Sequence, residues 1–276
     1  MLKRRFSLAI AATAAALAAT AVAGCGTNAQ PIDVKNVAAS EVLAQTAQKT
    51  TEVSSYTVDA VVDVSHPQDG SGKVQGRMLY QSRPQLALDL TVDAADVGER
   101  ELPGGARVVL HGDSVYVKVE ALNKMLGATK PWIKVPLTEA GDRDQVNQVL
   151  AQAQQFDLAS VTTMITASQD VRSVGNESVG GTDTTHYSGT FPVEAAVRQL
   201  PADKQEHARQ NLAELKDITF DIWVAADGLP RKLSMSGAQE GGKLDATLMF
   251  KGYNEPVNIK APAADQVGEL PEGTVN

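Results

Sequence analysis

The clearest chemistry in this sequence belongs to Cys25, the only cysteine in the chain. It follows Val22, Ala23 and Gly24, which are one aliphatic and two small residues. The thiolate is the nucleophilic form of cysteine, so this sulfur could take a covalent modification. Because there is no second cysteine, an internal disulfide is excluded.

The residues before Cys25 have the pattern of a secretory leader. Lys3, Arg4 and Arg5 form a positive head, and the apolar run that follows at 6–22 contains no acidic residue. This is typical of a signal peptide. The run is about 17 residues long and rich in alanine, at the short limit for crossing a hydrocarbon core, so a spanning helix is disfavoured. The sequence leaves open whether export uses the Sec or the twin-arginine route.

Val22 to Cys25 resembles the lipobox of bacterial lipoproteins. That resemblance implies lipidation of Cys25 by a thioether to a diacylglycerol, and cleavage of the chain before Cys25. The acyl anchor would hold the protein on the extracytoplasmic face of the bacterial cell membrane. The alternative is an ordinary cleaved signal that leaves Cys25 as a free thiol. A lone thiol is usually avoided in an oxidising compartment, which favours the lipidated form.

No other motif predicts catalysis, a cofactor or a metal. The chain has neither a Gly-x-Ser-x-Gly elbow nor a glycine-rich phosphate loop after a predicted strand, and its histidines lack paired-ligand spacing: His66, His111, His186 and His207. We expect a protein that is not an enzyme. His186 is predicted to be a hydrogen-bonded structural residue, and Trp132 and Trp223 to anchor the sheet or to line a cavity rim.

The charge of the chain argues against nucleic acid as a partner. The formal net charge is −8, and no cluster of Lys and Arg follows the leader, whereas nucleic-acid binding needs a basic face. Aromatic residues are only 4% of the chain. Stability must therefore come mainly from burial of aliphatic side chains.

Three regions are predicted: a signal peptide at 1–24, a lipidated tether at 25–36, and one folded domain at 37–276. Apolar residues recur at helical spacing over 37–50, which predicts a helix there. Further helices are expected at 121–126, 142–153, 156–165 and 193–215. The last of these is polar beyond Pro201 and is expected to rest as a lid over a cavity mouth.

Elsewhere the apolar period changes from 3.6 to 2, which indicates strands with one buried face. We predict strands at 58–64, 74–81, 86–93, 108–110, 115–119, 132–135, 171–179, 182–190, 218–225, 229–236 and 244–253. Short connections such as 226–228 favour antiparallel pairing. The predicted fold class is α+β, with a single strongly curved antiparallel sheet and helices covering its concave face.

The residues predicted to face inward from these strands are nearly all aliphatic. They are the candidate lining of a lipid cavity: Leu86, Leu88, Leu90, Val115, Val117, Ile222, Val224, Leu233, Met235 and Leu248. Flexible aliphatic walls suit disordered acyl chains. The alternative for each residue is a packed core, which is the usual role of an apolar strand face.

Several short motifs resemble the LppX/LprG-type lipoproteins of actinobacteria. They are the lipobox, the Ala-Ser-Glu-Val-Leu sequence at 39–43, the Trp-Ile-Lys-Val strand at 132–135, the Gly180, Thr182, Thr185, His186 and Tyr187 set, the Ile-Trp-Val hairpin strand at 222–224 with Asp-Gly-Leu-Pro-Arg at 227–231, and the stretch from Tyr253 to Pro262. The resemblance covers most of the chain after the tether.

This resemblance implies a LolA/LolB-like half-barrel that encloses a hydrophobic cavity for acyl chains. The implied function is binding or transport of lipids or lipoglycans in the cell envelope, with the membrane reached through the anchor. Two alternatives remain: a membrane-anchored sensor or interaction lipoprotein that uses the half-barrel to dock a regulatory envelope protein, and a structural envelope protein with a fully packed core.

Overall fold

The computed structural model describes residues 34–66, 70–97, 100–101, 105–120, 123, 127–137, 157–212, 215–239 and 242–269. These residues all belong to one compact unit, Asp33–Asn276. The predicted signal peptide, Cys25, most of the predicted tether and the predicted helix at 142–153 lie outside the described residues. Of the predicted helix at 121–126, only Asn123 is described, and it is helical.

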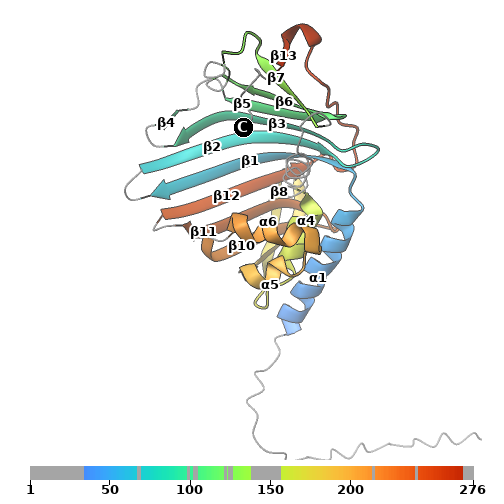
Figure 1. The fold of residues 1–276 in the computed structure, drawn as a ribbon. Helices are drawn as coiled ribbons and strands as arrows, with labels where there is room; N and C mark the ends of the chain where they lie inside the picture. Colours follow the sequence, from blue (N-terminus) through green and yellow to red (C-terminus); the bar gives the residue numbers. More distant parts are fainter. Residues whose placement is uncertain are drawn as a thin grey trace, which may run out of the picture. The chain divides into compact units, whose positions relative to one another are not determined.

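A single sheet of thirteen strands dominates the described residues, as Figure 1 shows. The strands are β1 Ser55–His66, β2 Gly70–Gln81, β3 Ala87–Val97, β4 Arg100–Glu101, β5 Ala106–His111, β6 Ser114–Val119, β7 Trp132–Pro136, β8 Arg172–Val179, β9 Thr182–Thr190, β10 Leu215–Ala225, β11 Pro230–Gln239, β12 Gly242–Lys251 and β13 Val267–Glu269. Their spatial order is β13-β7-β6-β5-β3-β2-β1-β12-β11-β10-β9-β8, and β4 pairs with β3.

Nearly all neighbouring strands run antiparallel, as short turns between alternating segments predict. The β8–β9 turn shows why: Gly180 and Gly181 have φ angles of 57° and 82°, which only glycine adopts freely and which suit a tight hairpin. The prediction of a wholly antiparallel sheet is wrong at one edge, because β13 pairs with β7 in parallel. The long segment after β12 carries the chain back to that edge, and a parallel pair needs such a crossover.

Four α-helices are described: α1 Val34–Thr51, α4 Leu158–Ile165, α5 Val193–Val197 and α6 Ala202–Leu212. Helix α1 begins three residues before the predicted start, so the end of the predicted tether is helical. The single helix predicted at 193–215 is instead two helices, and Leu215 opens β10. Pro201 lies between them, where its missing N–H suits a helix start and not an interior.

The helices lie on one side of the sheet, with α6 in front of β10 and β11 in the view of Figure 1 and α1 in contact with β8. We call this face the inner face. The Leu158 backbone N–H at the start of α4 donates to the Tyr56 hydroxyl of β1 at 3.3 Å, which fixes α4 against that side. The α+β class, the single curved sheet and the helices on one face are thus confirmed.

Candidate functional site

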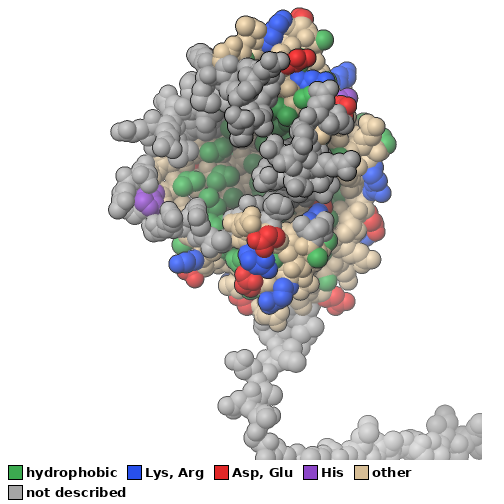
Figure 2. All heavy atoms as spheres, viewed as in Figure 1, with side chains coloured by type: hydrophobic (Ala, Val, Ile, Leu, Met, Phe, Trp, Pro, Cys, Tyr) green, Lys and Arg blue, Asp and Glu red, His purple; other side chains and the backbone are tan. Residues whose placement is uncertain are grey.

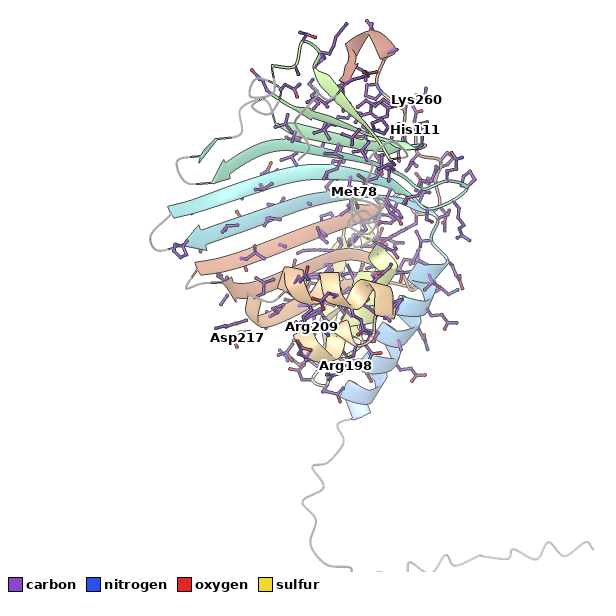
Figure 3. All side chains as sticks on the ribbon, viewed as in Figure 1. Met78, His111, Arg198, Arg209, Asp217 and Lys260 are labelled. Atoms are coloured by element: carbon purple, nitrogen blue, oxygen red, sulfur yellow. The ribbon has the colours of Figure 1, made fainter. Side chains whose placement is uncertain are left out.

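The inner face of the sheet is a continuous apolar surface. Strand register aligns one row of side chains across seven strands, and every member is aliphatic or aromatic: Phe250, Val58, Met78, Leu90, Val108, Val117 and Ile133. Met78 of this row is labelled on β2 in Figure 3. Because side chains alternate between faces along a strand, residues two positions away extend the same surface.

The ten predicted lining residues all fall within, or pack against, the main hydrophobic core. Five are buried: Leu88, Val115, Ile222, Val224 and Leu233. The other five are partly buried and pack against that core: Leu86, Leu90, Val117, Met235 and Leu248. Leu86 precedes β3 and is not in a strand. The set therefore divides into packed core and partly open surface.

Most residues of β1 and β12 are only partly buried, as is Leu90 of β3. Figure 2 shows hydrophobic side chains gathered in a hollow of the surface over β1, β2 and β3. By contrast Phe220 on β10 is fully buried, at 0% exposed. A surface of this kind is where an apolar ligand can contact side chains without displacing the core.

Small residues form the middle of this open region. Ala60 of β1 stands between Gly76 of β2 and Leu248 of β12, and Ala246 stands opposite Val62. An added Cβ at Gly76 would lie 2.6 Å from the Thr91 carbonyl oxygen, so glycine is required there by the close approach of β3. The sequence pattern did not reveal this floor, since its residues are adjacent only through the register.

Aromatic side chains cluster near the ends of β1, β2 and β12, within or against the main core. Tyr56 and Tyr80 have ring centroids 5.0 Å apart, and Phe250 and Tyr253 complete the cluster. Burial, with a smaller contribution from Asp157, raises the pKa of Tyr80 to about 12. Burial likewise raises the pKa of Tyr56 and of Tyr253. These hydroxyls therefore stay neutral at ordinary pH, and the aromatic cluster carries no charge.

Helix α6 is held at the edge of the inner face by a small core and one polar anchor. Ala208 packs with Val197 and Leu200 in a cluster separate from the main core. The Lys204 ammonium donates to the Ser160 hydroxyl at 3.1 Å and lies 3.9 Å from the Asp157 carboxylate. Arg209, labelled in Figure 3, pairs with Glu206 on the same helix. The role of α6 as a lid stays a prediction.

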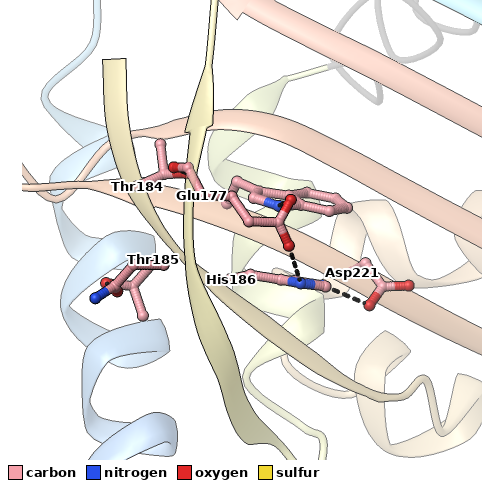
Figure 4. A network of polar contacts seen from close by, with 7 residues as sticks. Glu177, Thr184, Thr185, His186 and Asp221 are labelled. Carbon is pink, nitrogen blue, oxygen red and sulfur yellow. Dashed lines mark hydrogen bonds and ion pairs between the residues drawn. The ribbon is translucent and has the colours of Figure 1, made fainter. Parts of the chain in front are cut away.

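The outer face carries charged and polar networks instead. Figure 4 shows His186, whose ring nitrogens contact Glu177 at 3.0 Å and Asp221 at 2.7 Å. The His186 ring stacks on Trp223 at 4.2 Å, and the Trp223 indole N–H donates to Glu177 at 3.1 Å. The prediction of a hydrogen-bonded His186 is confirmed. These partners are all side chains of the same sheet.

Both tryptophans are anchors of the outer face. Trp223 is 6% exposed within the His186 stack, and Trp132 is 6% exposed in a second core with Ala87, Val109 and Ile259. That core forms where the C-terminal segment packs against the outer face of the sheet. Alternation within single strands does not predict this contact. Of the two roles expected for the tryptophans, both residues therefore anchor the sheet and do not line a cavity rim.

Within the part of the chain that the structure describes, no cluster of three or more His, Cys, Asp or Glu side chains is arranged to hold a metal ion. None of the described helices is both long and apolar enough to cross a membrane. Cys25 lies outside the described residues, so its lipidation stays a prediction.

Comparisons with known proteins identify relatives. The profile of the LppX_LprAFG lipoprotein family matches residues 38–259. An uncharacterized 31.2 kDa protein from the rplA-rplJ intergenic region of Streptomyces griseus is 34% identical over 114 residues, which are 38% of this chain and 36% of that protein. The match thus spans only about a third of that relative's length.

Solved structures with a similar chain path include two mycobacterial lipoproteins. LprF from Mycobacterium bovis is 16% identical with a TM-score of 0.48, over 82% of this chain and 98% of that one. LppX from Mycobacterium tuberculosis is 18% identical with a TM-score of 0.43, over 80% and 98%. A LolA superfamily protein from Nitrosomonas europaea is 10% identical with a TM-score of 0.30, over 80% and 94%.

Proposed function

Because this chain belongs to the LppX_LprAFG lipoprotein family, we propose that it binds the acyl chains of lipids or lipoglycans on its inner face and carries them within the cell envelope. The observation that supports this proposal is the hollow over β1, β2 and β3, where hydrophobic side chains remain partly open. Polar and charged groups are confined largely to the opposite face, as Asp59, Arg77 and Lys251 illustrate.

Binding would be driven by burial of apolar surface, at about 0.8 kcal/mol for each methylene removed from water. An acyl chain in a bilayer is already out of water, so the net free energy of transfer is the difference between the donor and acceptor sites. The mechanism is passive and needs no catalytic residue.

A direct test compares two neighbouring substitutions on β3. Leu90 lies on the inner face, whereas Thr91 lies on the outer face, paired with Arg77 and with Arg107. The chain is purified from host membranes, and the bound lipid is extracted and quantified per mole by mass spectrometry. We expect Leu90→Asp to lower bound lipid by about tenfold or more, because a carboxylate in an apolar site is strongly unfavourable.

Thr91→Asp is the matched control, since it adds the same carboxylate beside two guanidinium groups, and it should leave the bound lipid unchanged. Circular dichroism establishes that both variants are folded. A folded Leu90→Asp chain that keeps its lipid would place the ligand elsewhere. Wild-type chain that carries no lipid would refute the proposed function itself.

We also propose that Cys25 carries the acyl anchor that holds this domain at the extracytoplasmic face of the cell membrane. Cys25→Ser replaces the thiol by a hydroxyl that the thioether chemistry cannot use. Intact mass spectrometry should show a diacylglyceryl addition on wild-type chain and none on the variant, and the variant should not be processed before residue 25. An unmodified wild-type Cys25 would favour the ordinary cleaved signal.

A further inference from the structure

A second hollow of about 490 Å³ lies away from the open apolar region, between α1 and the ends of β8, β9 and β10. Val42 of α1 and Val224 and Ala225 of β10 contribute apolar groups to it. The remaining lining is polar: Asn176, Glu177, Ser178, Asp183, Thr184, Thr185 and Tyr187, with Ala226 at the β10 end. Its volume lies in the range of small-molecule sites.

Hydrogen bonds within the protein already occupy part of this lining. The Thr184 hydroxyl donates to the Glu177 carbonyl at 2.7 Å, and the Glu177 carboxylate is engaged by His186 and Trp223 on the outer face (Figure 4). The Thr185 hydroxyl donates to Asn176 Oδ1 at 3.1 Å, which holds the amide and leaves its two N–H donors for another partner. These bonds hold the backbone and side chains of the hollow in place.

Three lining groups remain available to a ligand. The Asn176 amide offers donors, the Ser178 hydroxyl offers a donor and acceptors, and the Asp183 carboxylate offers acceptors. Among the described residues, neither Ser178 nor Asp183 forms a side-chain hydrogen bond or ion pair in the structure. Both flank the β8–β9 turn and stand opposite each other in the register. The pair therefore presents acceptor and donor groups side by side.

The charge of the hollow restricts the ligand. Two carboxylates, those of Glu177 and Asp183, lie in the lining, and no Lys or Arg does, so an anionic ligand would meet repulsion without a compensating cation. The available groups instead match vicinal hydroxyls, which donate to a carboxylate and accept from an amide. The Tyr187 ring and Val224 supply apolar surface for C–H groups. We propose that this hollow binds a neutral polyhydroxylated ring, such as a sugar.

This proposal does not depend on the proposed acyl-chain site, because the two hollows lie on different strands. The probe is methyl α-D-glucopyranoside, titrated into the full chain with saturation-transfer NMR as the readout. We expect saturable binding by the wild-type chain. Asp183→Ala should weaken it by about tenfold or more, since hydrogen bonds to a charged group are among the stronger ones, and Ser178→Ala should weaken it less.

Asp265→Ala is the matched control, because Asp265 is an exposed carboxylate in the segment before β13, far along the sheet order from β8. It should bind the probe as wild type does, and all variants should have the wild-type melting temperature. If the wild-type chain shows no saturable binding, or if Asp183→Ala binds as well as Asp265→Ala, the proposal is overturned.

The sugar ring could come from a free glycan or from the head group of a glycolipid, and a second arm separates these sources. Phosphatidylcholine vesicles with and without a monoglucosyl diacylglycerol are incubated with the chain and floated on a density gradient. Glycolipid-dependent flotation that Asp183→Ala loses assigns the site to a lipid head group. Binding of the free glycoside without such flotation assigns it to a soluble glycan.

Discussion

Leu233 on β11 and Leu248 on β12 stand directly opposite each other on the inner face, yet their surroundings differ. Leu233 is 1% exposed, whereas Leu248 is only partly buried and packs at the margin of the core. Helix α6 lies in front of β10 and β11 in the view of Figure 1. Residue type and strand position are the same for this pair, so the packing around each residue decides whether an inward leucine is core or partly open surface.

The same contrast separates the two parts of the sheet. At the covered part, Phe220, Ile222 and Leu233 are almost completely buried, and their side chains stabilise the fold. At the open part, Leu90, Val117 and Leu248 keep some exposure, and the floor between them is made of small residues. A sheet can thus use one kind of side chain both for stability and for a binding surface.

The largest expected effect comes from truncating the covered member of the leucine pair. Leu233→Ala should lower the free energy of unfolding by about 2–5 kcal/mol, the usual cost of a buried leucine. Leu248→Ala should cost about half of that or less, because its side chain is only partly removed from water. Urea denaturation of both variants measures the difference. Equal losses would show that the two parts of the sheet are packed alike.

The amount of bound lipid should fall more in Leu248→Ala than in Leu233→Ala, the reverse of their order in stability. Leu248→Ala removes apolar surface from the open region and should lower the lipid bound per folded molecule, by about tenfold for every 1.4 kcal/mol by which the binding free energy weakens. Leu233→Ala should leave that ratio near wild type once the folded fraction is taken into account. Mass spectrometry of extracted lipid provides the measurement, and a larger decrease in Leu233→Ala would reverse the assignment of the two regions.

A smaller effect on the free energy of unfolding is expected from substitution of two buried threonines of α1. The Thr50 hydroxyl bonds to Thr162 of α4 at 2.7 Å and to the Ala47 carbonyl, so Thr50→Val should cost about 1–2 kcal/mol. The buried Thr46 hydroxyl has no hydrogen-bond partner among the described residues, so Thr46→Val should be neutral or stabilising. Thermal unfolding compares them, and an equal loss in both would contradict the bonding pattern.

The smallest expected effect is on the pH dependence of stability, and it comes from Asp59 on the outer face of β1. Burial disfavours the charged form of Asp59, but hydrogen bonds from Arg77 and Lys251 outweigh it and lower the pKa of Asp59. A lowered pKa contributes stability above the unfolded value near 3.9, and this is lost as the pH falls through the folded value. Asp59→Asn should therefore lose less stability than wild type below about pH 4.

Because the Asp59 carboxylate is about a third exposed, the contribution should stay below about 1 kcal/mol at neutral pH. Urea denaturation at pH 3 and pH 7 measures it for wild type and for Asp59→Asn. A pH dependence that is identical in the two chains would show that the Arg77 and Lys251 contacts do not stabilise the fold.

Much of the sheet follows from the sequence. Alternation along a strand predicts which residues share a face, and all ten predicted lining residues do lie in or against the inner core. The β10–β11 hairpin and the short strand at Trp132 are where the pattern places them. These features depend on residues close in the chain, and local periodicity and turn residues are sufficient to specify them.

Other features depend on residues far apart in the chain. The parallel pairing of β13 with β7, the outer core of Trp132 and Ile259, and the break at Pro201 were not predicted. The hollow beside α1 combines three strands and a helix. Of its polar residues, Thr185 and Tyr187 belong to a short sequence motif, and that motif does not predict a hollow. Such sites arise from register and packing, which no single segment encodes.

The sequence by itself therefore determined the faces: which side chains point inward, which point outward, and that Cys25 is the one thiol available for an anchor. Only the tertiary structure decided which part of the inner face is covered and which stays open. The physical reason is that alternation is a property of one strand, whereas burial depends on what packs over it. Leu233 and Leu248 obey the same pattern, and only their tertiary surroundings distinguish them.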